Sequence, residues 1–222
     1  MTASLAAVVF DFDGLILDTE WSIYERAAAA FGDHGHDLPV DLWGAVVGLT
    51  DGPGGWYDQL CDRLGVGLAR ADFDRVYASK PRADLDLLEP LPGVVALLDA
   101  LHGAGVPSAI ASGSSGEWLE GHLGRLGLRD RFDTVVGVDR VGGVGKPAPD
   151  VYLAACADLG AAPNRSVALE DSAHGTTAAR AAGMAVVAVP SRLTRASAFD
   201  HADRVVGSLT EITVADLAAL VA

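Results

Sequence analysis

Short apolar runs that alternate with helical patterns constrain the fold of this 222-residue chain more than any other feature. Each run is continuous and rich in Val, Ile and Ala, which is typical of strands buried on both faces of a parallel sheet. We expect strands at residues 6–10, 108–111, 134–138, 167–169, 185–189 and 205–206, and helices at 93–102, 117–126, 150–159 and 175–182, each ended by a glycine. The alternation predicts an α/β fold with a mostly parallel, Rossmann-like sheet covered by helices on both faces.

One long stretch breaks this alternation. From about residue 19 to residue 88 the chain shows helical patterns and no convincing strand. Four helices are expected there, at 19–31, 40–47, 55–64 and 72–83, joined by links that contain glycine or proline. The sequence therefore predicts an α/β core domain, made of residues 1–18 and 89–222, interrupted by an all-helical domain of residues 19–88.

Composition narrows the functional classes. Half of the residues are hydrophobic, enough for a sizeable core, and the net charge is −14. That charge repels nucleic acid and anionic lipid, so neither is an expected partner. The N-terminal residues lack the charge and apolar run of a signal peptide, and no apolar stretch approaches the roughly 20 residues of a membrane helix. Cys61 and Cys156 lie far apart and read as free thiols, so we expect a cytoplasmic protein.

Polar side chains follow four of the expected strands at the point where each strand ends. They are Asp11 and Asp13 after the first strand, Ser112 and Gly113 after the second, Lys146 beyond the third, and Glu170 and Asp171 after the fourth. Open α/β sheets bind ligands at the carboxyl ends of their strands, so these groups are expected to converge. Carboxylates without cysteine or convergent histidine select a hard cation, and Mg²⁺ is the usual one beside phosphate. The set predicts phosphoryl transfer.

The excess of negative charge at the strand ends suggests different catalytic roles for Asp11 and Asp13. Four carboxylates remain net negative even with one Mg²⁺ and one lysine, before a phosphate dianion arrives. Backbone N–H groups near residues 113–115 add partial positive charge, and protonation of one carboxylate removes more. We assign that proton to Asp13, which would donate it to the leaving alkoxide. As a base, Asp13 would then activate water against an aspartyl-phosphate on Asp11.

Taken in order, these residues resemble the four motifs of the haloacid dehalogenase-like (HAD) hydrolases. The resemblance extends over nearly the whole chain and points to the phosphatases with a small helical cap, which share a subfamily with the β-phosphoglucomutases. The motifs read Asp11-Phe12-Asp13-Gly14 with Asp18-Thr19-Glu20, then Ala111-Ser112-Gly113, then Gly145-Lys146-Pro147 with Pro149-Asp150, and last Leu169-Glu170-Asp171-Ser172 with Gly175.

The resemblance implies a role for each motif residue. Asp11 would be the nucleophile and a Mg²⁺ ligand, and Asp13 would be the acid/base and offer its main-chain carbonyl to the metal. Ser112 and the N–H of Gly113 would hold phosphoryl oxygens, and Lys146 would neutralise the transferring group. Asp171 would complete the metal site with Glu170. Residues 14–17 would form a flap, and the helical insertion a cap that closes over the substrate.

The remainder of the substrate is expected to meet the cap. Glu20 and Thr50 are the candidate substrate-binding residues there, and the ligand is expected to be a small phosphorylated metabolite. The four tryptophans, Trp21, Trp43, Trp56 and Trp118, are interpreted mainly as packing residues. We expect a monomer or a weak homodimer.

Proteins with several other activities have sequences similar to this one. A sugar phosphomutase of the β-phosphoglucomutase type stays the main alternative. Such enzymes carry an arginine after a Gly-x-(Ser/Thr) step and a histidine early in the cap, whereas here the step is Gly48-Leu49-Thr50-Asp51 and residues 19–26 contain no histidine. A phosphonate hydrolase needs a cap lysine, for which Lys80 is the one candidate. Asp13 and Asp171 argue against a dehalogenase, and the complete motif set argues against a non-catalytic relative.

Overall fold

A single parallel sheet organises the molecule. The computed structural model describes residues 5–49, 52, 54–81 and 85–222. Within these residues six strands pair in the order β3-β2-β1-β4-β5-β6, and every pairing is parallel. The strands are β1 (Ala7–Phe10), β2 (Ser108–Ala111), β3 (Thr134–Val136), β4 (Ser166–Glu170), β5 (Ala185–Ala188) and β6 (Arg204–Val205). The predicted α/β fold with a Rossmann-like sheet is confirmed.

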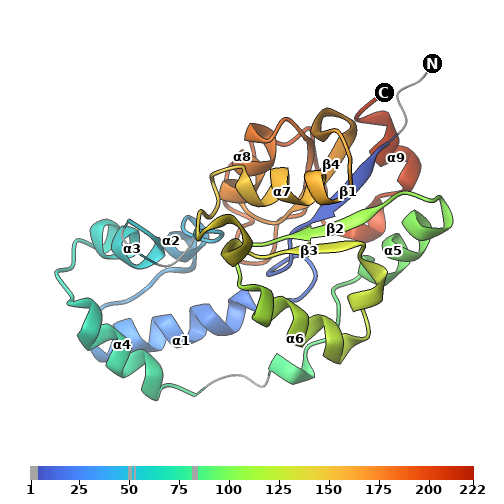
Figure 1. The fold of residues 1–222 in the computed structure, drawn as a ribbon. Coiled ribbons are helices and arrows are strands. Elements are labelled where there is room, and N and C mark those ends of the chain that lie inside the picture. Colours follow the sequence, from blue (N-terminus) through green and yellow to red (C-terminus); the bar gives the residue numbers. More distant parts are fainter. Residues whose placement is uncertain (1–4, 50–51, 53, 82–84) are drawn as a thin grey trace.

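Helices cover both faces of this sheet (Figure 1). Successive side chains of a strand point to opposite faces, so in β1 Val8 and Phe10 join one apolar cluster while Val9 joins the other. The first cluster packs against α5 (Val94–Gly103), α6 (Gly116–Leu126) and α9 (Val214–Ala219). The second packs against α7 (Asp150–Asp158) and α8 (Ala173–Ala181). Burial on both faces explains why the strands are apolar without a break.

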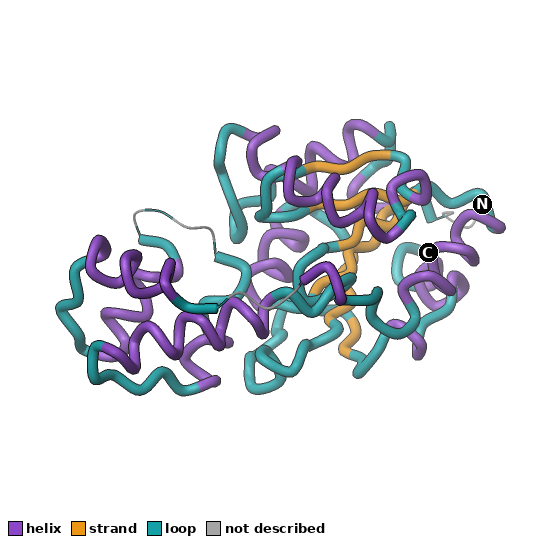
Figure 2. The backbone as a smooth tube through the Cα atoms, turned by 90° about the horizontal axis from the view of Figure 1, so that it is seen from below, coloured by secondary structure: helices purple, strands orange, loops and turns teal. Residues whose placement is uncertain are grey.

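The chain between β1 and β2 builds a third apolar cluster. It contains α1 (Glu20–Asp33), α2 (Val40–Gly44), α3 (Trp56–Leu64) and α4 (Arg70–Ser79). Aromatic side chains dominate this cluster, and Phe73 lies 4.9 Å, centroid to centroid, from both Phe31 and Tyr57. Figures 1 and 2 show these helices together at one end of the molecule, beside the sheet rather than on its faces.

Element ends differ from the predicted ones where local geometry intervenes. The third strand stops at Val136, because the chain turns at Gly137 into a short 3-10 helix, Val138–Val141. The predicted helix 72–83 is shifted to Arg70–Ser79; Lys80 is extended, as expected for a residue before proline, and residues 82–84 lie outside the described part. α9 was not predicted, although Thr213 and Asp216 form a capping box at its start.

Two further predictions concern the chain as a whole. Cys61 and Cys156 are both buried and neither takes part in a disulfide. Across the residues that the structure describes, none of the helices combines the length and the apolar character needed to span a bilayer.

Candidate active site

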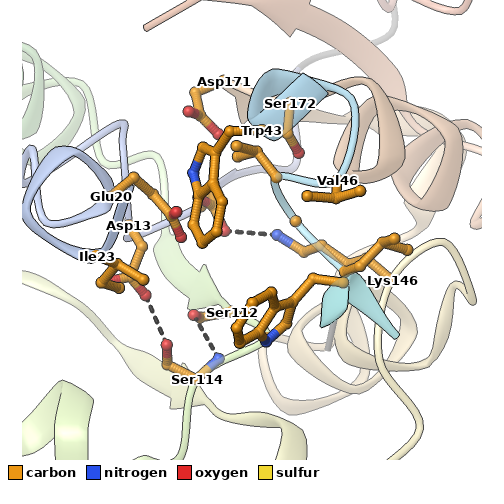
Figure 3. A pocket seen from close by; sticks show the side chains of 16 residues that line it. Asp13, Glu20, Ile23, Trp43, Val46, Ser112, Ser114, Lys146, Asp171 and Ser172 are labelled. Carbon is orange, nitrogen blue, oxygen red and sulfur yellow. Dashed lines mark hydrogen bonds and ion pairs between the residues drawn. The ribbon is translucent and has the colours of Figure 1, made fainter. Parts of the chain in front are cut away.

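Three neighbouring strands deliver the motif residues to one edge of the sheet. β2, β1 and β4 lie side by side; Ser112 follows β2, Asp11 follows β1, and β4 ends at Glu170. Phe10 pairs in register with both Ile110 and Leu169, so the three strand ends are level. The convergence that the sequence predicted follows from this register (Figure 3).

Lys146 is the positive centre of the site. It is buried, and its Nζ lies 2.5 Å from Asp11 Oδ1 and 2.5 Å from Glu170 Oε1. Burial disfavours its charge, but the carboxylates of Asp11 and Glu170 outweigh that effect and hold the pKa of Lys146 above its usual value. For Asp11 burial dominates and raises the pKa to about 7, although the Lys146 ammonium acts in the opposite direction.

Glu170 has its two oxygens filled by hydrogen bonds. Oε1 accepts from Lys146 Nζ and from the hydroxyl of Tyr152, both at 2.5 Å. Oε2 accepts from the main-chain N–H groups of Asp171 and Ser172 and from the Ser172 hydroxyl, at 3.1 to 3.2 Å. A methyl group at Gly175 would lie 1.9 Å from this carboxylate, so only glycine fits there. These contacts make Glu170 an anchor for Lys146, and Glu170 also belongs to the group of three carboxylates that could hold a metal ion.

Asp171 differs from Glu170, because one of its oxygens is open. The side chain is buried, and Oδ2 has no hydrogen-bond partner among the described residues. One oxygen each of Asp11, Glu170 and Asp171 lies within 4.8 Å of the others. Burial and the charge of Asp11 raise the pKa of Asp171. An orphaned buried oxygen in an all-oxygen donor set fits a hard divalent cation held by Asp11 and Asp171.

Asp13 is held by three hydrogen-bond donors. Oδ1 accepts from the Thr19 hydroxyl at 2.7 Å and from the Trp118 indole N–H at 3.1 Å. Oδ2 accepts from the Ser114 hydroxyl at 2.6 Å. The sequence did not predict the hydrogen bond from Trp118, for which it indicated only a packing role. Its signal was weak: a tryptophan in the first turn of a helix that begins beside the second motif.

The loop after β2 lines the cavity beside the carboxylates. Ser112 is fully buried, and its hydroxyl accepts from the N–H of Ser114 at 3.0 Å. Ser112, Gly113 and Ser114 line the same cavity as Asp11 and Lys146. Ser115 then caps α6, with its hydroxyl accepting from the N–H of Trp118. The expected pair of Ser112 and Gly113 is therefore beside the carboxylates.

A cavity of about 180 Å³ extends from these groups toward α1–α3. Its far wall is mostly apolar and comes from the helical insertion, namely Ile23, Trp43, Val46, Val47, Leu49 and Trp56. Glu20 is the acidic residue of that wall (Figure 3). Burial and then the charges of Asp13 and Asp11 raise its pKa to about 8.

Other candidates from the sequence lie elsewhere. Thr50 falls outside the described residues. Lys80 pairs with Asp33 at 2.6 Å and does not line the cavity, so the basis for a phosphonate hydrolase is lost. Trp21 is not part of the cavity lining either; Arg192 stacks over its ring at 3.8 Å.

Comparison with known proteins agrees with this geometry. The sequence matches the haloacid dehalogenase-like hydrolase family over residues 8–189. YhcW from Bacillus subtilis (strain 168) is 36% identical over 213 residues, 95% of each chain. The fructose-1-phosphate phosphatase YqaB from Escherichia coli (strain K12) is 36% identical over 190 residues, 83% of this chain and 96% of that protein. The crystal structure of CbbY from Rhodobacter sphaeroides in complex with phosphate superposes with a TM-score of 0.70 and 27% identity, covering 96% of this chain and 99% of that one. The chain belongs to the haloacid dehalogenase-like hydrolase family.

Proposed function

We propose that this protein is a Mg²⁺-dependent phosphatase that hydrolyses a small phosphomonoester through an aspartyl-phosphate on Asp11. The observation that carries the proposal is the buried contact of Lys146 Nζ with Asp11 Oδ1, at 2.5 Å, beside the hydrogen-bonded carboxyl of Asp13. The positive charge of a lysine in that place offsets the negative charge of the Asp11 carboxylate. It can also offset the negative charge of an incoming phosphoryl group. Phosphatase relatives such as YqaB support the same reaction class.

In the first step a carboxylate oxygen of Asp11 attacks phosphorus. A new P–O bond forms to Asp11 while the bond from phosphorus to the leaving oxygen breaks, and its electron pair stays on that oxygen. Asp13 gives its proton to this oxygen, so the product leaves as an alcohol. The Ser112 hydroxyl, the N–H of Gly113 and Lys146 hold the phosphoryl oxygens.

In the second step water attacks the phosphorus of the aspartyl-phosphate. Asp13, now a carboxylate, takes a proton from that water as the new P–O bond forms. The bond between phosphorus and Asp11 breaks and returns its electron pair to the Asp11 carboxylate. Inorganic phosphate leaves, and both aspartates regain their starting protonation.

The metal site of this proposal uses buried carboxylates that lie next to one another after β1 and β4. Asp11 and Asp171 would hold Mg²⁺ through their side chains, with the main-chain carbonyl of Asp13 as a further ligand, while Glu170 holds Lys146 from behind. The bound cation supplies positive charge next to the phosphoryl group.

The cavity lining favours hydrolysis of a monophosphate over the phosphomutase alternative. Lys146 is the one cation among the described residues that line the cavity, and Asp11 and Glu170 already engage it. A second phosphate would face the apolar wall and Glu20. We propose that the substrate is a phosphorylated metabolite with a single phosphate, in keeping with the name of YqaB.

The proposal also includes a role for the helical insertion and a cytoplasmic location. We propose that residues 19–88 act as the cap that excludes bulk water from the aspartyl-phosphate, on a core of residues 1–18 and 89–222. A cytoplasmic location fits the two free buried thiols. The prediction of a monomer or weak homodimer stays a prediction.

Phosphate release by Asp11→Asn and by metal-free protein tests the proposal. We expect the variant to lose turnover by roughly 10³-fold or more, because the amide is no nucleophile. EDTA should abolish activity, and Mg²⁺ should restore it and raise the melting temperature of the wild type more than that of Asp171→Asn. Wild-type turnover by Asp11→Asn would disprove the mechanism. A hexose phosphate isomer in place of free phosphate, in ³¹P spectra of the product, would favour the mutase.

A further inference from the structure

Trp118 is the one donor to Asp13 that comes from a distant helix and carries a nonrotatable N–H. Thr19 and Ser114 donate through hydroxyl groups, which rotate and can also accept. The indole Nε1 of Trp118 can only donate, and it lies 3.1 Å from Asp13 Oδ1. Of the three contacts, this one therefore does most to define the direction in which the carboxyl points.

The two carboxyl oxygens of Asp13 accept different numbers of hydrogen bonds. Oδ1 accepts twice, from Thr19 and from Trp118, and each carboxylate oxygen offers about two lone-pair sites. Oδ2 accepts once, from Ser114. A proton on Oδ1 would require the Thr19 hydroxyl to turn and accept it, because the indole N–H cannot accept. Oδ2 is therefore the oxygen with the freer lone pair.

Packing fixes the indole in this position. The Ser115 hydroxyl accepts from the main-chain N–H of Trp118, which holds the first turn of α6. His122, one turn later, packs its ring edge-on to the indole with the centroids 4.5 Å apart. The His122 ring also lies near Phe12, the residue before Asp13, with the ring centroids 6.2 Å apart. The loop that carries Asp13 and the helix that carries Trp118 are thus braced against each other.

We propose that Trp118 is a positioning residue for the acid step: its indole N–H holds Asp13 Oδ1, so that Oδ2 faces the leaving oxygen. The proposal rests on the proposed function, in which Asp13 protonates that oxygen. Trp118 itself touches neither the phosphate nor the reacting atoms in this scheme. Loss of the N–H would leave Asp13 chemically intact but free to rotate.

Leaving-group dependence separates this role from simple packing. A p-nitrophenolate ion departs without a proton, whereas an alkoxide from a sugar or polyol phosphate needs one. The ratio kcat/KM reports the steps up to formation of the aspartyl-phosphate, where the acid acts. In Trp118→Phe we expect kcat/KM to fall roughly 10- to 100-fold for an alkyl phosphate and less than about threefold for p-nitrophenyl phosphate. Trp21→Phe, which changes a tryptophan outside the cavity, should leave both values unchanged.

Asp13→Asn separates the failure of this inference from the failure of the proposed function. If Asp13 is the acid, Asp13→Asn should show a larger loss with the same preference for p-nitrophenyl phosphate; equal losses on both substrates would remove Asp13 from that role. If Asp13→Asn behaves as expected but Trp118→Phe lowers both substrates equally, or neither, Trp118 is a packing residue. Should Trp118→Phe not fold, benzothienylalanine at position 118 keeps the shape of the indole without its N–H, and the same two outcomes apply.

Discussion

Glu20 lies where the helical insertion meets the carboxylates of Asp11 and Asp13. It is the first residue of α1, half-buried, and its side chain faces the cavity beside Asp13 and Trp43 (Figure 3). Burial, and then the negative charges of Asp13 and Asp11, raise its pKa to about 8. Glu20 is therefore mostly protonated at neutral pH and can donate a hydrogen bond into the cavity.

The stability of the metal-free protein should depend on pH through Glu20. Its pKa is about 8 in the folded state and near 4.5 when unfolded, so its stabilising contribution is present below about pH 4.5 and is lost as the pH rises toward 8. Glu20→Gln removes this loss. In EDTA we expect the variant to be more stable relative to wild type at pH 8 than at pH 5, by roughly 1–3 kcal/mol, in thermal melts.

Glu25, exposed on the same helix, provides the matched control. Glu25→Gln should change the stability difference between pH 5 and pH 8 by less than about 0.5 kcal/mol. An equal pH dependence of wild type and Glu20→Gln would mean that Glu20 is ionised in the folded protein at neutral pH.

At the scale of elements, helix ends set both the site and the edge of the core. Ser115 fixes the start of α6 and so the place of Trp118. α9 begins with a reciprocal pair, in which Thr213 Oγ1 accepts from the N–H of Asp216 at 3.2 Å and Asp216 Oδ2 accepts from the N–H of Thr213 at 2.9 Å. Leu217, fully buried, attaches α9 to the core. Figure 1 shows α9 at the end of the molecule away from α1–α4.

Thr213→Ala should therefore affect stability without affecting catalysis. Loss of the N-cap is expected to lower the free energy of unfolding by about 1 kcal/mol, measured by urea denaturation. Thr213→Ser, which keeps the hydroxyl, should stay within a few tenths of a kcal/mol of wild type. Phosphatase activity should be unchanged in both variants; a tenfold loss in Thr213→Ala would show that α9 acts on the site.

At the scale of the whole molecule, main-chain contacts hold the insertion against the core. A methyl group on Gly44, in α2, would lie 2.3 Å from the carbonyl oxygen of Leu193. One on Gly48 would lie 2.6 Å from the Ser172 hydroxyl. His174, in the first turn of α8, has Nδ1 3.1 Å from the carbonyl oxygen of Val47. The chain from Gly44 to Gly48 thus forms the contact through which the cavity wall is placed over Asp11.

Gly44→Ala should prevent this close approach. The helical backbone at Gly44 accepts alanine, but its Cβ cannot occupy the space next to Leu193. We expect kcat/KM to fall about tenfold or more, because the wall moves away from the carboxylates that we propose act in catalysis, with a melting temperature within about 4 °C of wild type. Steady-state kinetics and thermal melts measure the two effects.

Gly32→Ala is the matched control, because it also replaces a helical glycine of the insertion by alanine. Gly32 lies in α1, is exposed, and a methyl group there would meet nothing within 4 Å. This variant should keep wild-type kinetics and gain up to about 1 kcal/mol of stability. Unchanged kinetics in both variants would contradict the idea that close contact at Gly44 sets the cavity wall.

The sequence by itself determined the sheet and the residues at its carboxyl edge. Strands buried on both faces must be apolar throughout, so their ends are visible as the points where Asp11, Ser112 and Asp171 begin. Parallel pairing then brings those points together. The helical insertion was visible for a similar reason, because 3.6-residue patterns replaced the strands. The ends of the helices and of the third strand were inexact, and the C-terminal α9 was missed.

The tertiary structure alone decided which hydrogen-bond partners those carboxylates have. Trp118 reaches Asp13 across 105 residues, and Tyr152 reaches Glu170 across 18. Neither contact has a periodicity or a spacing that a sequence could display, because each depends on how a helix packs on the sheet. Glu170 and Asp171 are adjacent carboxylates in the sequence, yet packing fills one with donors and leaves the other an open oxygen. Hydrogen bonding is a matter of distance and angle, and those are fixed only when the chain has folded.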